Sequence, residues 1–333
     1  KSTKIVLLPQ EGAIPVRDFV VNERYTGKQS GGGAFLDGIS KVFIWGPQTA
    51  EWLLEARVFS PEQVSVSGSP RFDPYMVPST RVAANNPQSV GFAHGFGIMN
   101  VYHQGSVMEL VEDRRNVDEN SYYAPGRNVE DLIWYHTACI RSVFDVLERC
   151  VGRDIGPLYI RPGPFELVEG YKFLKHKYPG LLVSNDLPVS KWTEKLCCLV
   201  THQSSTGIDA LMADVPTISL NKLLGPRLRD HMNIPIFVDV PTLGYYWQPD
   251  TLDEAVEMLE AAQKGRLPLT PNPEGFSQYM KDFYDWPRNE PSSLTIAKEI
   301  SRLANAYTGK AQKVRPLPRP YEKEGIPGPF QSA

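Results

Sequence analysis

The sequence predicts an α/β fold built from parallel sheets that are covered by helices. Short apolar runs recur along the chain, and stretches with helical periodicity separate them. The runs are apolar throughout rather than alternating, which is typical of strands buried on both faces of a parallel sheet. A length of 333 residues with 41% hydrophobic content is enough for a sizeable core and about two domains.

Each predicted strand is a short apolar run bounded by polar or turn-forming residues. We expect strands at 4–8, 41–46, 63–68, 89–95, 157–163, 181–186, 197–203, 216–221 and 234–240. We expect helices at 49–58, 129–150, 165–178, 208–215 and 292–307. In the longest helix the apolar positions recur at helical spacing, at Leu132, Ile133, Cys139, Ile140, Val143, Phe144 and Leu147. That stripe predicts a core-facing side rather than a ligand site.

Shifts in composition mark the expected domain boundaries. The polar, Pro- and Asn-bearing stretch 76–90 predicts a hinge, and 264–276 predicts a second break. We therefore expect a first domain over 1–85, a second over 86–270, a closing helical segment over 271–307 and a Pro-rich tail over 308–333. An extended or disordered tail is the favoured interpretation, and a recognition role for its "RPLPRP" stretch stays open.

Composition argues against several classes of protein. A net charge of -3 and a pI of about 6.1 argue against nucleic-acid binding. The four cysteines lack metal-ligand spacing, so we expect buried, reduced side chains in a reducing, cytoplasmic setting; they are Cys139, Cys150, Cys197 and Cys198. We expect neither a signal peptide nor a membrane-spanning helix, because no run approaches about 18 apolar residues.

The strongest candidate site is the stretch "THQSSTG" at 201–207, between a predicted strand and a predicted helix. In an open parallel sheet, ligands bind where strands end and helices begin. The hydroxyls and the histidine predict a phosphate-binding turn, and the glycine allows close approach of the backbone; the residues are His202, Ser204, Ser205, Thr206 and Gly207. The alternative is an ordinary helix cap, for which one hydroxyl would suffice.

Two further loops fall at equivalent places after predicted strands. In "YIRPGPFE", Arg161 suits phosphate recognition and Glu166 could accept hydrogen bonds from a ribose. The alternative there is a Pro-stiffened connection with a surface salt bridge. In "GFAHGFGIMN", His94 is a candidate catalytic residue, and Gly95, Gly97 and Asn100 would line the cleft. A structural histidine is an equally good interpretation of His94.

Two candidate groups come from the first predicted domain. Glu11 follows the first strand in "LLPQEG" and could act as a general base or nucleophile, although an exposed loop glutamate is an equal alternative. The string "VSGSPRFDPY" follows another strand, and we expect Ser69, Arg71 and Asp73 to face the cleft.

These strings together resemble the bacterial surface carbohydrate biosynthesis proteins, which are surface-polysaccharide glycosyltransferases of the GT-B type. "FIWGPQTAEWLLE" and "SGSPRFDPY" resemble their "WG…G-x-P-R-x-D" string, and "PQEG" resembles their "EEG" loop. "IRPGPFE" is similar to their "R-P-H-P-x-E" element, and "THQSSTGIDALMADVPTIS" to their "H-x-S-x-T-T-G-x-E-A…G-x-P" element. The resemblance covers about residues 5 to 305 and leaves out the tail.

The resemblance implies two Rossmann-like domains that face a cleft, with the donor nucleotide in the second domain. Its nucleotide- and phosphate-binding residues would be Arg161, Glu166, His202, Ser204, Ser205, Thr206 and Gly207, and Glu11 would lie near the reacting sugar. The chain departs from the family pattern at Gly163, where a histidine is usual, and at Asp209, where a glutamate is usual. Because members carry a further strand–helix unit before the "EEG" loop, we expect the first domain to be N-terminally incomplete.

We therefore expect a glycosyltransferase that moves a sugar from a nucleotide-sugar, with a CMP-activated sugar as one option, to a cell-surface or lipid-linked glycan. We expect no cofactor, because the nucleotide-sugar is a substrate. We expect no metal, because no acidic metal motif is compelling and the charge of the leaving nucleotide would be held by Ser/Thr hydroxyls, the dipole of the 207–212 helix and Arg161. A nucleotide-sugar 2-epimerase of similar fold and an inactive binding protein remain the alternatives. We expect a cytoplasmic location, and peripheral contact with the inner face of the membrane stays open.

Overall fold

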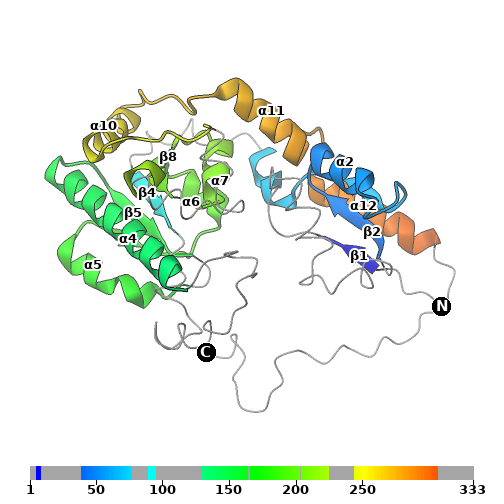
Figure 1. Cartoon of the computed structure of the whole chain (residues 1–333), viewed down its shortest axis with the longest axis horizontal. Coiled ribbons are helices and arrows are strands. Elements are labelled where there is room, and N and C mark those ends of the chain that lie inside the picture. The colour runs from blue at the N-terminus through cyan, green and yellow to red at the C-terminus, as the bar shows by residue number, and fades with distance from the viewer. Residues whose placement is uncertain are drawn as a thin grey trace, which may run out of the picture.

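The computed structural model describes most of the chain as two parallel sheets with helices packed on them (Figure 1). The described residues are 5–8, 39–76, 89–94, 129–163, 166–202, 204–224 and 244–306. This arrangement confirms the predicted α/β class with Rossmann-like parallel sheets. The predicted strand 234–240, the centre of the predicted hinge at 77–88 and the tail 308–333 lie outside the described residues.

The first unit is a parallel sheet with the order β1-β2-β3. Its strands are β1 (Ile5–Leu7), β2 (Ile39–Ile44) and β3 (Val64–Val66), and helix α2 (Pro47–Glu55) connects the last two. Leu53 of α2 packs against the buried side chains of β2. Strand β2 is buried almost throughout, which explains why its sequence is apolar without alternation.

The second unit is a larger parallel sheet with the order β6-β5-β4-β7-β8. Its strands are β4 (Ser89–Ala93), β5 (Leu158–Arg161), β6 (Leu182–Val183), β7 (Leu196–Thr201) and β8 (Thr217–Ser219). From β4 the chain runs outward through β5 and β6, then returns to the other side of β4 to form β7 and β8. The strand order therefore reverses between β4 and β7, which makes that place a topological switch point.

Helices cover both faces of the second sheet. Helices α4 (Val129–Gly152), α5 (Lys172–Lys177) and α10 (Leu252–Gln263) pack on one face, with a 3-10 turn at Val168–Tyr171 before α5. Helices α6 (Val189–Thr193) and α7 (Thr206–Met212) pack on the other. A 3-10 turn at Asn221–Leu224 follows β8. Helices α6 and α10 were not in the predicted set, although Ala255, Val256, Leu259 and Ala262 of α10 recur at helical spacing and are buried.

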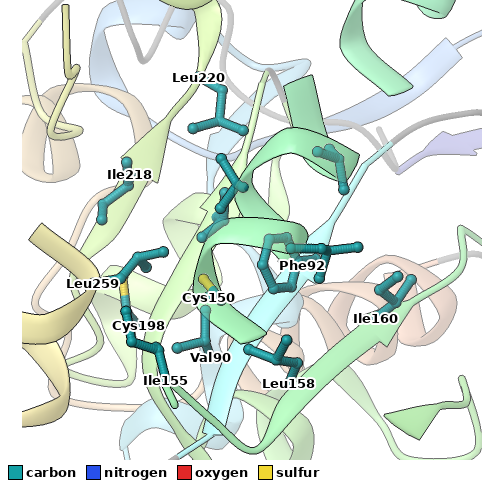
Figure 2. Close-up of a cluster of buried hydrophobic side chains, with 14 of the residues drawn as sticks. Val90, Phe92, Cys150, Ile155, Leu158, Ile160, Cys198, Ile218, Leu220 and Leu259 are labelled. Carbon is teal, nitrogen blue, oxygen red and sulfur yellow. The ribbon is translucent and has the colours of Figure 1, made fainter. Parts of the chain in front are cut away.

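The main core lies between the second sheet and the helices α4, α5 and α10 that cover one of its faces (Figure 2). Val90, Phe92 and Ile160 on the strands contribute to it, together with Ile218. All four cysteines are buried and free, which confirms their expected role as small core residues. Burial raises the pKa of the Cys139 and Cys150 thiols to about 12 because a thiolate is poorly solvated there.

The last two helices return to the first unit, as the orange ribbon beside the blue one shows in Figure 1. Helix α11 (Pro273–Tyr284) packs on α2, and α12 (Ser292–Ala306) packs on the 3-10 turn Pro70–Met76. Helix α11 begins inside the predicted break 264–276, where Asn272 caps it and Pro273 starts it. An aromatic cluster then joins both units: Trp45, Phe72, Ile208, Leu211, Tyr245, Tyr246, Phe276, Tyr279, Met280 and Tyr284.

Gly46 shows how closely α11 approaches the first unit. A Cβ at this position would overlap the backbone of Phe283. We expect Gly46→Ala to lower the free energy of unfolding by about 1–3 kcal/mol, because overpacking forces backbone shifts. Urea unfolding measures this, with Gly152→Ala as the control because no atom lies within 4 Å of a Cβ there. Equal stability of the two variants would contradict the close packing.

Candidate functional site

Three of the predicted site residues lie at the carboxyl edge of the second sheet. His94 directly follows β4, Arg161 ends β5 and His202 directly follows β7. Strand β4 pairs with both β5 and β7, so these three residues come from the ends of adjacent strands. The switch point between β4 and β7 is the place where open α/β sheets bind ligands.

Two histidines face each other at the switch point. The Nδ1 atoms of His94 and His202 lie 2.9 Å apart, and the Nε2 atom of His202 lies 2.8 Å from the Oγ atom of Ser142 on α4. The exposed fractions are 5% for His94 and 4% for His202. Burial lowers the pKa of His202 to about 3, with a further contribution from His136, and burial also lowers the pKa of His94. Both rings are therefore neutral at physiological pH.

The hydroxyls of the 201–207 turn divide into internal and accessible groups. The Thr201 hydroxyl accepts a hydrogen bond from the Ser204 backbone N–H at 3.1 Å, and the Ser204 hydroxyl accepts one from the Thr206 N–H at 3.2 Å. These bonds shape the turn, as the helix-cap alternative requires. Ser205 is exposed and Thr206 is half-buried, and Ser205 makes no side-chain cap. The Ser205 hydroxyl accepts a hydrogen bond from Nη1 of Arg71 at 3.2 Å.

Gly207 has a packing role in this structure. A Cβ at Gly207 would overlap the hydroxyl of Tyr246, whose side chain is 2% exposed. The space that a side chain would fill is thus occupied by an aromatic ring of the cluster that joins both units. The glycine was predicted to allow close approach to a ligand, whereas here it allows close approach of Tyr246.

Arg71 connects the first unit to helix α7 of the second. Its Nε and Nη2 atoms donate to the two carboxylate oxygens of Asp209, and its Nη1 atom donates to the Ser205 hydroxyl at 3.2 Å. The Tyr75 hydroxyl donates to Asp209 at 3.2 Å. Burial raises the pKa of Asp209, whereas Arg71 and the hydrogen bonds counteract this. The sequence predicted that Arg71 faces the cleft but did not identify Asp209 as its partner. An acidic residue within an otherwise apolar helix, such as Asp209 in α7, is the signal that could have identified it.

Arg161 and Glu166 lie near each other in sequence but have different surroundings. The Nη1 atom of Arg161 donates to the Leu187 carbonyl at 2.7 Å, and its guanidinium lies 5.7 Å from the Trp192 ring centre. Burial lowers the pKa of Arg161. Glu166 is buried and accepts a hydrogen bond from the Tyr171 hydroxyl. A side chain at Gly163 would press on the Glu166 carboxylate, so the glycine makes room for it.

Of the remaining candidates from the first unit, Asp73 has a structural role and Ser69 is buried. Asp73 accepts hydrogen bonds from the backbone N–H groups of Ser292 at 2.6 Å and Ser293 at 2.9 Å. It therefore caps the start of α12, which differs from the expected position facing the cleft. Ser69 is 2% exposed, so its hydroxyl does not line an open surface. Glu11, Gly95, Gly97 and Asn100 lie outside the described residues.

Other features of the described residues lie apart from this site. A surface groove of about 560 Å³ runs along α2, β3 and α11, and its lining includes Glu51, Glu55 and Asp282 but no predicted site residue. Within the described ranges, no cluster of three or more His, Cys, Asp or Glu side chains could hold a metal ion. No helix in the same ranges is long and apolar enough to cross a membrane.

Comparison with known proteins finds solved structures of similar fold but low sequence identity. No family model matches the chain, and no curated protein matches its sequence. The wall teichoic acid polymerase TagF matches 81% of this chain and 61% of its own, with 12% identity and a TM-score of 0.48. The Methanocaldococcus jannaschii UDP-GlcNAc 2-epimerase in complex with UDP-GlcNAc and UDP matches 80% and 62%, with 13% identity and a TM-score of 0.42.

A third neighbour is S. aureus MnaA in a structure with UDP, at 12% identity and a TM-score of 0.42, covering 84% of this chain and 64% of that one. The chain spans about three fifths of the length of these structures. At such identities and TM-scores the likeness carries no argument about activity. The fold class follows from the two parallel sheets of the chain itself.

The Arg71–Asp209 pair leads to a prediction about stability and pH. We expect Arg71→Ala to lower the free energy of unfolding by about 3–5 kcal/mol, because it leaves the buried carboxylate of Asp209 without its cation. The value should lie toward the low end of that range, because the Arg71 side chain is 33% exposed. The loss of Arg71 raises the pKa of Asp209 further. The folded variant then binds a proton more tightly than its unfolded chain, so the deficit should shrink as the pH falls.

Urea unfolding of wild type and variant at several pH values measures this deficit. Arg302→Ala is the matched control, because it removes an exposed guanidinium that lies 2.7 Å from Glu299. We expect that control to change stability little at any pH. A deficit for Arg71→Ala that grows toward acid pH would contradict the assignment of Asp209 as the buried partner.

The histidine pair leads to a prediction about protonation. The pKa of His202 in the folded protein is about 3, below the ordinary value of 6.5. The unfolded chain therefore binds more protons between these values, and stability should fall as the pH falls through this window. Side-chain NMR at about pH 5 should show neutral rings for His94 and His202 in the folded protein and protonated rings in urea. Protonated rings in the folded protein would contradict their burial.

Proposed function

We propose that the chain binds a nucleotide-sugar at the carboxyl edge of the second sheet and transfers the sugar to a cell-surface or lipid-linked glycan. The observation that carries the proposal is the hydrogen bond from Arg71 to exposed Ser205 beside the start of α7, which follows β7, while Arg161 ends β5 in the same sheet. Arginine suits phosphate because its planar fork of N–H groups matches the phosphate oxygens. The resemblance to the surface carbohydrate biosynthesis proteins supports the same assignment.

In this proposal the protein holds the charge of the leaving nucleotide with side chains. As the glycosidic bond to phosphate breaks, negative charge develops on the phosphate oxygen, and preorganised N–H and O–H donors stabilise it. Arg71 is preorganised because Asp209 holds two of its nitrogen atoms, which leaves Nη1 directed at Ser205. The role of Glu11 as general base or nucleophile belongs to the same proposal.

Thermal unfolding with added nucleotides tests the donor site. We expect one of CMP, UDP, GDP and dTDP to stabilise the wild type, by roughly 2.7 kcal/mol at 100 times its dissociation constant. Ser205→Ala/Thr206→Ala should lose that increment, because it removes two hydroxyls of the proposed phosphate-binding turn. Ser301→Ala, an exposed hydroxyl on α12, is the control and should keep it. If no nucleotide stabilises the folded wild type, the proposal fails.

The products of turnover separate the alternatives. A transferase should release free nucleotide from the stabilising nucleotide-sugar when a glycan acceptor is present. A 2-epimerase should instead yield an isomerised nucleotide-sugar. Stabilisation without either product would favour a binding protein.

A further inference from the structure

A groove on the first unit is lined by apolar and acidic residues. It has a volume of about 560 Å³ and runs along β3 and the neighbouring helices α2 and α11 (Figure 1). Leu54 and Val66 contribute apolar surface, whereas Glu51 of α2 and Asp282 of α11 contribute carboxylates. None of the described residues that line it is a lysine, an arginine or a histidine. A ligand in the groove would therefore meet negative charge from both helices next to an apolar surface.

The hydrogen bonds of these two carboxylates leave their charge in place. Nε2 of Gln48 donates to Glu51 at 2.9 Å, and Nε2 of Gln278 donates to Asp282 at 2.7 Å. An amide donor carries no net charge, so these bonds orient the carboxylates without neutralising them. Glu55, one turn further along α2, adds a third carboxylate to the lining. The groove therefore suits a partner that carries several positive charges beside apolar side chains.

The chain itself contains a segment with this chemistry after α12, outside the described residues. Residues 313–320 read "KVRPLPRP", which holds three cations and no acidic residue. A polyproline II segment has three residues per turn, so residues three apart share a side. In that conformation Val314 and Leu317 would share one side. Lys313 and Arg319, six residues apart, would share another. The sequence of the segment therefore combines an apolar side with a cationic side, as the groove requires.

Helix α12 brings this segment within reach of the groove. Lys41 and Val42 are successive residues of β2, so their side chains point to opposite faces of the first sheet. Val42 belongs to the core cluster with Leu53 of α2, whereas Nζ of Lys41 lies 3.6 Å from Oε1 of Glu299 on α12. Helix α12 therefore lies on the face opposite α2, roughly 20 Å away at roughly 10 Å per packed layer. Residues 307–313 can span about 25 Å when extended, which is enough to cross that distance.

We propose that residues 313–320 bind in this groove of the same molecule. The cations would lie beside the carboxylates of Glu51 and Asp282, and the apolar side would pack on Leu54 and Val66. Two observations select this occupant: its charge and apolar pattern complement the groove, and it is covalently joined to a helix of the same unit. A tethered segment meets its site at an effective concentration on the order of mM, so individually weak contacts suffice.

Carbodiimide cross-linking of the dilute full-length protein, read out by mass spectrometry, tests the contact. The reagent forms an amide only between an amine and a carboxylate that touch. The wild type should link Lys313 to Glu51, Glu55 or Asp282 within one chain, and about 1 M salt should reduce the yield several-fold by screening the charges. A mixture of 14N- and 15N-labelled protein separates links within a chain from links between chains. No such link, or links of Lys313 only between chains or only to carboxylates outside the groove, would overturn the proposal.

An exchange of charge between the two partners tests the assignment. Glu51→Lys/Asp282→Lys should lose the links of Lys313 to the groove, including any to Glu55, because the added cations repel the segment. Addition of Lys313→Glu/Arg319→Glu to that variant should restore a link between the same positions, with amine and carboxylate exchanged. Loss of folding would not produce this restoration. An unchanged link of Lys313 to Glu55 in the folded double variant, or no restoration in the folded fourfold variant, would overturn the proposal.

Glu257→Lys/Glu274→Lys is the matched control, because it makes the same change in net charge at exposed residues that do not line the groove. It should keep the wild-type links of Lys313. If Glu51→Lys/Asp282→Lys does not fold, Glu51→Lys alone replaces it, since Glu51 is exposed and its substitution disturbs no core packing. These measurements use no nucleotide, so failure of this proposal and failure of the proposed function are separate results.

Discussion

The contact between Arg71 and Asp209 is the interaction on which the arrangement of the two units depends. Asp209 is almost fully buried on α7, and its carboxylate is stabilised by a guanidinium that comes from the other unit. A buried carboxylate without a cation is strongly unfavourable, so the pair favours the arrangement in which the 3-10 turn of the first unit meets α7. The aromatic cluster around Phe72 and Ile208 removes water from the same junction.

The same turn serves the candidate site and the closing helices together. Arg71 reaches the Ser205 hydroxyl, while Asp73, two residues later, caps α12. The position of the guanidinium at the predicted phosphate turn is therefore coupled to the helices that close the chain.

Burial also determines the chemical state of the residues at the switch point. His94 and His202 are neutral because the interior solvates an imidazolium poorly. Arg161 keeps its charge beside Trp192 and a backbone carbonyl. The edge of the sheet thus combines an arginine at the end of β5 with two buried neutral imidazole rings at the ends of β4 and β7.

The sequence by itself determined the parallel sheets, because strands buried on both faces must be apolar throughout, as in β2 and β7. It also placed His94, Arg161 and His202 at strand ends, since strand boundaries are local features. Only the tertiary structure decided which of these residues meet. The strand order that makes β4 and β7 neighbours, the partner of Arg71, the capping role of Asp73 and the contact of Ser142 with His202 are all long-range. Local pattern cannot encode them, because each depends on how separate elements pack.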